Sequence, residues 1–236
     1  MSQISNLKPD ISAYTIIVAG GTGTRMQSPL LKQFILLNDR PLLFYTIEAF
    51  ATSEYAPEIV LVLHPDFHDY WQNLCKEYKF KVPHKLVEGG SSRFQSVKNG
   101  LETITDTSAV IAVHDAVRPL ASKTIIDDAY QYAAKNGNAV VAVQSRDSVR
   151  QLREGVSGAL LRSEIYLVQT PQTFNMKQLS EAYKQPYSDA FTDDASVVEK
   201  AGFAINLIEG AYTNIKITYP EDIAIAELLL NKKPSA

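Results

Sequence analysis

The sequence predicts an α/β fold: a Rossmann-like, mainly parallel twisted sheet with helices on both faces, plus a protruding β-arm. Short apolar runs rich in β-branched residues alternate along the chain with longer runs of helical periodicity, as strands and helices do around a parallel sheet. Small or charged residues follow several of the apolar runs directly. The alternation stops between about residues 145 and 170, where no amphipathic helix is visible. These observations predict one domain, residues 1–236, with the β-arm inserted at about 145–170.

Apolar runs predict the strands. The first run, residues 14–19, is continuous and partly β-branched, which is typical of a buried strand. The other predicted strands lie at residues 58–64, 85–88, 109–114, 138–144, 204–208 and 214–218. Polar and apolar residues alternate in the last of them, so Asn214, Lys216 and Thr218 are expected on one face.

Helical periodicity predicts helices between these strands and after them. Pro41, at a first-turn position, opens a helix that runs to about Phe50. Ser122 can cap the helix of residues 123–135, and Gly137 ends it. The other predicted helices span residues 66–78, 92–103, 175–183, 192–201 and 223–230.

The β-arm is predicted from a segment of different character. Two short runs, residues 148–152 and 159–162, flank the turn-rich stretch 154–158. We interpret them as strands of an arm that leaves the core. An arm with one apolar face usually packs against another surface, often a second subunit.

Composition narrows the class of protein. The chain has 236 residues, of which 45% are hydrophobic, enough for a large core. A net charge of −3 and a pI near 5.8 give no basic field that would attract nucleic acid. A lone cysteine, Cys75, excludes an internal disulfide. The polar N-terminus lacks the apolar core of a signal peptide, and no apolar run approaches the roughly 20 residues of a membrane span. We therefore expect a cytoplasmic protein.

A glycine-rich stretch follows the first strand. Three glycines fall within residues 20–23, and Arg25 and Lys32 add two cations. A bare main chain beside fixed positive charges suits a polyphosphate. An ordinary glycine-rich turn with solvated cations explains the stretch equally well. The P-loop pattern is absent, and Met26 occupies the position of the third glycine of the dinucleotide fingerprint, which disfavours a dinucleotide-dependent oxidoreductase.

Unusual residues also follow the strands at 85–88 and 109–114, where an open α/β sheet carries its ligands. Gly90 lies in a small-residue loop that could admit a base or a ribose, with Ser96 offering a hydroxyl, although a simple turn and helix cap fits too. Asp115 could hold a ribose hydroxyl or hydrated Mg²⁺, and Arg118 could fork onto a phosphate. The competing interpretation is an Asp–Arg pair that locks a loop.

Two further observations concern the chemistry. A lysine such as Lys216 on an exposed strand is often only a protection against edge pairing, but near the glycine loop it would be a third cation for phosphates. No serine nucleophile motif is present, and the four histidines are scattered. The sequence therefore favours chemistry done by positioning and charge, as in phosphoryl and nucleotidyl transfer.

Taken together, the motifs resemble the sugar-phosphate cytidylyltransferases, and among them most resemble the 2-C-methyl-D-erythritol 4-phosphate cytidylyltransferase family of the non-mevalonate isoprenoid pathway. The resemblance spans residues 14–231 and rests on six motifs in order, at residues 19–33, 89–101, 114–119, 169–174, 192–196 and 214–218. The chain departs from the family at Leu31, which usually is proline, at Val117, which usually is alanine, and at Ser148, which usually is threonine.

The resemblance implies a role for each matching residue. Residues that would line the nucleotide are Ala19, Gly21, Gly23, Gly90, Ser96, Asp115 and Ala116. Catalytic cations that would hold the phosphates are Arg25, Lys32 and Lys216. Residues that would hold the methylerythritol phosphate, some of them across a dimer formed by the arm, are Arg118, Ser148, Arg162 and Thr170. Asp115 would also sit by the Mg²⁺ cofactor.

The implied reaction transfers CMP from CTP to 2-C-methyl-D-erythritol 4-phosphate, giving 4-diphosphocytidyl-2-C-methyl-D-erythritol and pyrophosphate. The expected partners are CTP, a polyol phosphate and a second copy of the chain, with neither nucleic acid nor membrane. The nearest alternative is a ribitol 5-phosphate cytidylyltransferase, which would differ in the arm that holds the acceptor. The other is a non-catalytic nucleotide-binding dimeric protein, and the presence together of Arg25, Lys32, Asp115 and Lys216 disfavours it.

Overall fold

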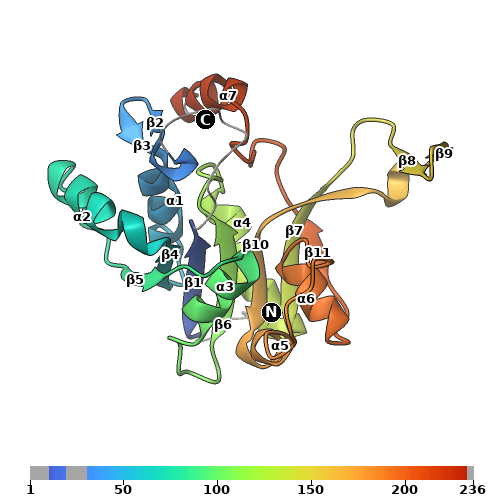
Figure 1. Cartoon of the computed structure of the whole chain (residues 1–236), viewed down its shortest axis with the longest axis horizontal. Helices are drawn as coiled ribbons and strands as arrows, with labels where there is room; N and C mark the ends of the chain where they lie inside the picture. Colours follow the sequence, from blue (N-terminus) through green and yellow to red (C-terminus); the bar gives the residue numbers. More distant parts are fainter. Residues whose placement is uncertain (1–10, 20–30, 233–236) are drawn as a thin grey trace, which may run out of the picture.

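The chain is described by a computed structural model that covers residues 11–19 and 31–232. A seven-stranded sheet forms its centre, in the order β11-β7-β10-β6-β1-β4-β5 (Figure 1). Its strands are β1 (Ala13–Val18), β4 (Glu58–Leu63), β5 (Lys85–Glu88), β6 (Val110–Asp115), β7 (Asn138–Gln144), β10 (Tyr166–Asn175) and β11 (Leu207–Glu209). Neighbouring strands are parallel except at β10, which runs antiparallel to both β6 and β7. The predicted mainly parallel sheet is confirmed.

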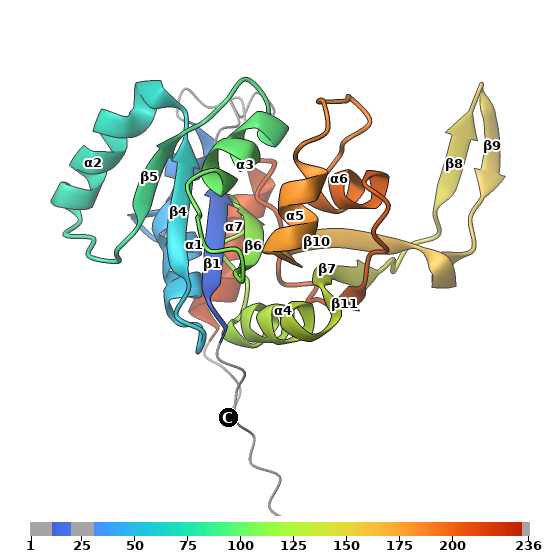
Figure 2. The same cartoon turned by 90° about the horizontal axis from the view of Figure 1, so that it is seen from below.

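Helices cover both faces of this sheet, as predicted. The helices are α1 (Leu42–Ala51), α2 (His68–Glu77), α3 (Arg93–Leu101), α4 (Lys123–Asn136), α5 (Met176–Ala182), α6 (Asp194–Lys200) and α7 (Glu221–Asn231). Short 3₁₀ turns occur at η2 (Lys32–Phe34), η3 (Pro65–Phe67) and η4 (Arg162–Glu164). Figure 2 shows α4 on one side of β7 and β10, with α5 and α6 on the other. No helix in the described part of the chain has the length and apolar character needed to cross a bilayer.

Two apolar clusters hold the layers together because successive strand residues face opposite sides. Ile17 of β1 belongs to the cluster that includes residues of α1, α2 and α4. Its neighbour Ile16 belongs to the cluster formed with α3, α5 and α6. Both side chains are fully buried. The strand is thus covered on both sides, which explains why its sequence is a continuous apolar run rather than an alternating one.

The predicted helix ends agree with the structure where a cap was identified. The Ser122 hydroxyl accepts a hydrogen bond from the Ile125 amide at the start of α4. Gly137 follows α4 with φ +94°, a conformation that favours glycine. Asp193 caps α6 by accepting from the Ser196 amide. These local signals, which depend on one side chain and its near neighbours, were readable from sequence.

Strand β10 was missed. Its first half lies in the stretch assigned to the β-arm, its second half was assigned to no strand, and it occupies a central position in the sheet. The sequence Gln169–Thr173 is polar and contains Pro171, so it lacks the apolar run of a buried strand. The structure buries these residues, and most of their polar side chains find partners, whereas the Thr173 hydroxyl has none among the described residues. Gln172, for example, donates to the Asp193 carboxylate and accepts from the Ala195 amide.

The predicted strand at 214–218 is also wrong. The structure has an irregular segment there, outside the sheets of the described residues, which we call the Lys216 segment (residues 214–218). The expected common face of Asn214, Lys216 and Thr218 is not found either, because Asn214 is buried and Lys216 is exposed. Ile217 is fully buried and lies in an apolar cluster with Ala226 of α7. Asn214 is also buried, whereas Lys216 keeps 43% of its side chain exposed.

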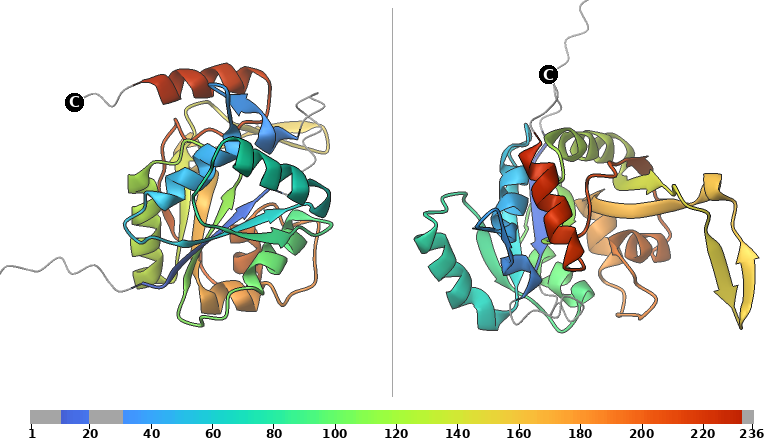
Figure 3. Two further views of the ribbon diagram at one scale, coloured as in Figure 1. Left: turned by 90° about the vertical axis from the view of Figure 1, so that its left-hand side faces the viewer. Right: turned by 90° about the horizontal axis from the view of Figure 1, so that it is seen from above.

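Between β7 and β10 the chain forms an antiparallel hairpin, β8 (Arg150–Arg153) and β9 (Val156–Ala159), separate from the main sheet. It stands away from the body, as the yellow strands in Figure 3 show. Glu154 and Gly155 form the turn with positive φ, so the turn is shorter than expected. The register also places Leu152 and Val156 on opposite faces, so the expectation of a single apolar face is wrong. Dimerisation through this region stays a prediction.

Candidate active site at the carboxyl ends of the strands

Backbone hydrogen bonds just beyond β1 and β6 tie strands β1, β4 and β6 together at the carboxyl edge of the sheet. The Ala19 amide donates to the Val62 carbonyl at 2.8 Å, and the Ala116 amide donates to the Val18 carbonyl at 3.1 Å. Both alanines are buried. These bonds continue the parallel ladder by one residue beyond the strands. They bring Ala19, Asp115 and Ala116, three of the residues predicted to line a nucleotide, to one edge of the sheet.

Asp115 is the centre of the charged cluster at this edge. Its Oδ2 atom lies 2.9 Å from the Lys216 ammonium and 3.6 Å from Arg118 Nε, while Oδ1 lies 3.6 Å from Arg93 Nε. Burial by itself raises the pKa of the Asp115 carboxyl, but the nearby positive charges, Arg93 first among them, outweigh burial and hold that pKa well below its usual range. Asp115 is therefore an ionised group with cations on both oxygens.

His114 and Thr170 hold Asp115 in position through hydrogen bonds. The Thr170 hydroxyl accepts from the Asp115 amide at 3.1 Å and lies 3.0 Å from His114 Nδ1. Nε2 of His114 faces the Arg118 carbonyl at 3.0 Å, and a carbonyl can only accept, so we assign the imidazole hydrogen to Nε2. Complete burial lowers the pKa of His114 to about 4, so its imidazole is neutral at pH 7. His114 therefore has a structural role in holding this loop. Thr170 holds the backbone of Asp115 by accepting a hydrogen bond from its amide, and the contact of Thr170 with substrate stays a prediction.

Lys32 reaches the same region from the other side of the sheet edge. Its ammonium donates to the Thr218 carbonyl at 3.1 Å, within the Lys216 segment. The η2 turn that carries Lys32 is anchored by Gln33, whose amide donates to the Ala19 carbonyl at 2.8 Å. Asp222 in the first turn of α7 accepts from the Thr218 amide at 2.7 Å. The two lysines, far apart in sequence, thus lie over one edge of the sheet.

The Gly90 loop is shaped by its own helix. The Gly90 amide donates to the Ser96 hydroxyl at 3.1 Å, and that hydroxyl donates to the Ser92 carbonyl at 2.9 Å. Ser96 is buried, so it holds the loop rather than offering a free hydroxyl. A Cβ at Gly90 would collide with the side chain of Gln95. Glycine is therefore required by close approach at this position, and its role toward a base stays a prediction.

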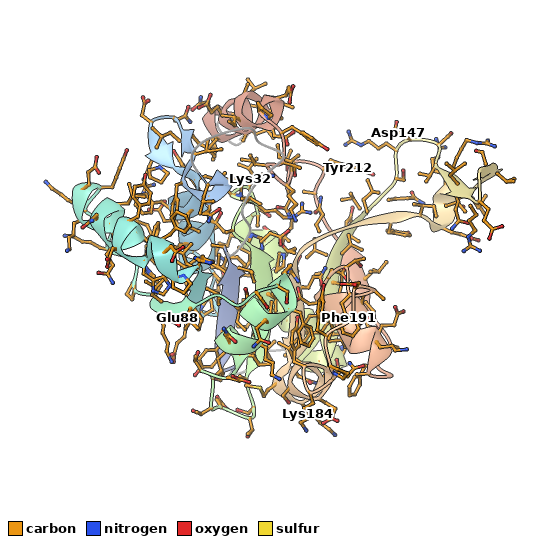
Figure 4. All side chains as sticks on the ribbon, in the orientation of Figure 1. Lys32, Glu88, Asp147, Lys184, Phe191 and Tyr212 are labelled. Carbon is orange, nitrogen blue, oxygen red and sulfur yellow. The ribbon has the colours of Figure 1, made fainter. Side chains whose placement is uncertain are left out.

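The four residues predicted to hold the polyol phosphate fall into two groups. Arg118 and Thr170 are buried in the cluster, where Arg118 Nη1 donates to the Asn214 carbonyl at 2.8 Å. Ser148 and Arg162 are exposed and flank the hairpin. Figure 4 shows Asp147, the neighbour of Ser148, well apart from Lys32. A single chain does not bring all four together. Gly21, Gly23 and Arg25 lie outside the described residues.

Two charged residues at the site were not assigned by sequence reasoning. Arg93, the first residue of α3, contacts Asp115 and makes a two-bond fork onto Asp194 at 2.9 and 2.6 Å. The only hints in the sequence were the positions of Arg93 and Asp194 in two of the six motifs, at residues 89–101 and 192–196. Arg93 and Asp194 are 101 positions apart, and a contact over that separation leaves no pattern that can be recognised in one sequence taken alone.

A metal can be tested against the same geometry. Within residues 11–19 and 31–232, no group of three or more His, Cys, Asp or Glu side chains could enclose a cation. Mg²⁺ in nucleotide sites, however, is usually held by one or two carboxylates together with substrate phosphates. Asp115 fits that mode of binding, provided that Lys216 gives up its contact with Oδ2.

Comparison with known proteins decides the family. The family model described as "2-C-methyl-D-erythritol 4-phosphate cytidylyltransferase" matches residues 13–232. The chain belongs to this family. Curated members from Azobacteroides pseudotrichonymphae and Porphyromonas gingivalis are each 45% identical to it, over 92% of this chain and 98% and 97% of theirs. This membership confirms the resemblance inferred from the motifs, and it makes the chain a cytidylyltransferase and thus a nucleotidyltransferase.

Solved structures agree with the family assignment. The 4-diphosphocytidyl-2C-methyl-D-erythritol synthase of Anaerococcus prevotii superposes with a TM-score of 0.82 at 27% identity, covering 95% of this chain and 98% of that one. The 2-C-methyl-D-erythritol 4-phosphate cytidylyltransferase of Thermus thermophilus gives a TM-score of 0.75 at 27% identity, covering 93% and 100%. The two alternative functions considered from sequence are not favoured by these comparisons.

Proposed function

We propose that this chain transfers CMP from CTP to 2-C-methyl-D-erythritol 4-phosphate, releasing pyrophosphate and forming 4-diphosphocytidyl-2-C-methyl-D-erythritol for isoprenoid biosynthesis. Membership of the family supports the substrates. The observation that carries the proposal within the molecule is the convergence of Lys32 on the segment that bears Lys216. Two cations fixed over the carboxyl edge of a parallel sheet suit a triphosphate.

The reaction follows from this arrangement. An oxygen of the methylerythritol phosphate attacks the α-phosphorus of CTP, and a new P–O bond forms. The bond from that phosphorus to the oxygen of the β-phosphate breaks in line, and pyrophosphate leaves with the electron pair. Lys32 and Lys216 stabilise the charge that gathers on the phosphate oxygens. Arg25 is proposed to assist them. No covalent intermediate with the protein is needed.

Asp115 keeps Lys216 in place until substrate arrives. The ammonium is 2.9 Å from the carboxylate, and its side chain is 43% exposed, so it can turn toward a phosphate without unfolding the segment. Arg118 Nε has no hydrogen-bond partner among the described residues and lies 3.6 Å from the same Oδ2 atom. It can satisfy that oxygen once Lys216 leaves. We keep Mg²⁺ as the proposed cofactor, with Asp115 as its candidate ligand; when bound, it would neutralise phosphate charge.

A homodimer is proposed because the hairpin region carries exposed apolar side chains and holds two of the substrate residues away from their own cluster. The exposed side chains are Leu152, Val156, Leu160, Leu161, Tyr166, Leu167 and Val168. Ser148 and Arg162 would then complete the site of a second copy, as the family resemblance implies. The cytoplasm is the proposed location, and nucleic acid is not expected as a partner.

Pyrophosphate release tests the proposed function directly. The purified protein is supplied with CTP, Mg²⁺ and either 2-C-methyl-D-erythritol 4-phosphate or ribitol 5-phosphate, and the nucleotide product is identified by its mass. We expect release with the first acceptor only. Release with ribitol 5-phosphate alone would contradict the proposed acceptor, and no release with either would contradict the proposed activity.

A further inference from the structure

Asp194 is a buried carboxylate that the reaction described above does not use. It is fully buried at the first position of α6. Burying a carboxylate is costly unless it is paired and hydrogen-bonded. Capping does not explain its presence, because the neighbouring Asp193 caps α6 by itself. Asp194 instead accepts two hydrogen bonds from Arg93 and one, at 2.6 Å, from the Tyr183 hydroxyl.

The two hydrogen bonds to Asp194 determine where the third guanidinium nitrogen of Arg93, Nε, lies. Both terminal nitrogens of the guanidinium are engaged, at 2.9 and 2.6 Å, and a guanidinium is planar. Its orientation is therefore fixed, with Nε 3.6 Å from Asp115 Oδ1. Arg93 thus sits between two carboxylates, one outside the proposed site and one at its centre.

Four side chains of alternating charge form a series of contacts. Asp194 of α6 binds Arg93 of α3, Arg93 faces Asp115 at the end of β6, and Asp115 holds the Lys216 ammonium. Arg93 is on one oxygen of Asp115 and Lys216 is on the other. Oδ2 is available to Lys216 because Arg93, held by Asp194, stays beside Oδ1.

We propose that Asp194 is a positioning residue for the cytidylyl transfer, acting through Arg93 and Asp115 on Lys216. Without the Asp194 charge, Arg93 remains cationic, and Asp115 is the other carboxylate with which it is ion-paired. The guanidinium then turns its fork onto Asp115 and takes both oxygens, which displaces Lys216. Because Lys216 acts on the charge of the transition state, the loss falls on kcat. This inference rests on the proposed function.

A double-mutant cycle tests the inference, with pyrophosphate release from CTP and 2-C-methyl-D-erythritol 4-phosphate as the readout. We expect Asp194→Asn to lower kcat by roughly 10-fold or more, as lost supporting contacts commonly do. We expect the KM for CTP to stay within about twofold, because the contact affected is made in the transition state. In an Arg93→Met background, Asp194→Asn should cause no further loss of kcat. Independent, multiplying losses would overturn the proposal.

Stability is separated from positioning by two measurements. Arg93→Met combined with Asp194→Asn removes both partners of the pair, which is often nearly neutral in stability. We expect this double variant to melt close to the parent protein and to regain most of the kcat that Asp194→Asn loses, because no guanidinium is left to displace Lys216. A double variant that melts like the parent protein but turns over as slowly as Asp194→Asn would overturn the proposal, and this holds even if a single variant fails to fold.

Matched controls come from the neighbouring residues. Asp193→Ala removes the cap of α6 without touching Arg93, so we expect a lower Tm and an unchanged kcat. Tyr183→Phe removes one hydrogen bond from Asp194 and leaves the fork intact, so kcat should stay within about twofold. A loss of kcat in Asp193→Ala equal to that in Asp194→Asn would assign the effect to α6 as a whole. An inactive parent protein would instead contradict the proposed function, which keeps the two failures distinct.

Discussion

The Lys32 ammonium lies 3.1 Å from the carbonyl oxygen of Thr218, two residues beyond Lys216. Residues separated by 186 positions thereby meet at the carboxyl edge of one sheet. The Lys32 ammonium is thus held against the backbone of the same segment that carries Lys216. Any anion that reaches both must lie over that edge, next to Ala19 and the loop after β6.

The first prediction concerns these two lysines. Lys32→Ala and Lys216→Ala should each lower kcat by roughly 10²–10³, because each removes a fixed charge that stabilises the transition state. Circular dichroism should show an unchanged fold. Lys184→Ala, on an exposed ion pair with Glu181, is the matched control and should leave kcat unchanged. Normal activity in either of the first two variants would contradict the proposed role.

The second prediction concerns pH and His114. Burial lowers the pKa of His114 to about 4 from its usual 6.5, so between these values the unfolded chain binds more protons than the folded one. The free energy of unfolding should therefore fall as the pH drops from about 6.5 toward 4, by roughly 3 kcal/mol in total. Urea denaturation at pH 7 and at pH 5 measures the change. His114→Gln should show a shallower pH dependence, and an equal slope in both proteins would contradict the assignment.

The third prediction concerns two adjacent glycines. A Cβ at Gly90 would collide with Gln95, whereas a Cβ at Gly89 would make only ordinary contacts, at 3.4 Å. Gly90→Ala should displace the loop and raise the KM for CTP by about tenfold, the effect of a small misplacement of a binding loop. Gly89→Ala should leave the KM near that of the parent protein. Equal effects of the two substitutions would show that the loop has no such requirement.

The fourth prediction concerns the apolar side chains near the hairpin. Leu161→Asp and Leu167→Asp should weaken the dimer, because each places a charge at the proposed interface. Sedimentation velocity should show a shift toward monomer at micromolar protein. Leu228→Asp on α7 is the matched control: it is the same substitution at a leucine that is 60% exposed but lies on another element. A dimer that survives both hairpin variants, or a wild-type monomer, would exclude this interface.

The fifth prediction follows if the arm completes the partner's site. Lys216→Ala and Arg162→Ala should each be weakly active alone. When the two proteins are unfolded together and refolded, half of the dimers are mixed, and one site in each mixed dimer is intact. Activity should then return to about a quarter of the parent value. No gain over the separate proteins would show that Arg162 acts within its own chain or not at all.

The sequence was most informative where the evidence is local. Strand β5 and strand β7 begin and end at the predicted residues, and Ser122 caps the predicted helix. Periodicity and capping depend on residues within a few positions of one another, so a single chain displays them. Strand β10 was missed for the opposite reason. Buried polar groups such as the Gln172 side chain and the Thr170 carbonyl are acceptable there because partners from other elements satisfy them.

By itself the sequence determined the α/β class, the positions of most helices and strands, and the family, because each depends on residue order and spacing. Only the tertiary structure decided which of the charged residues touch. Asp115 is shared by Arg93, Arg118 and Lys216, and Arg93 is in turn held by Asp194. Ion pairs act between atoms a few ångströms apart, and contacts between residues up to 101 positions apart exist only once the parallel sheet has brought their loops to one edge.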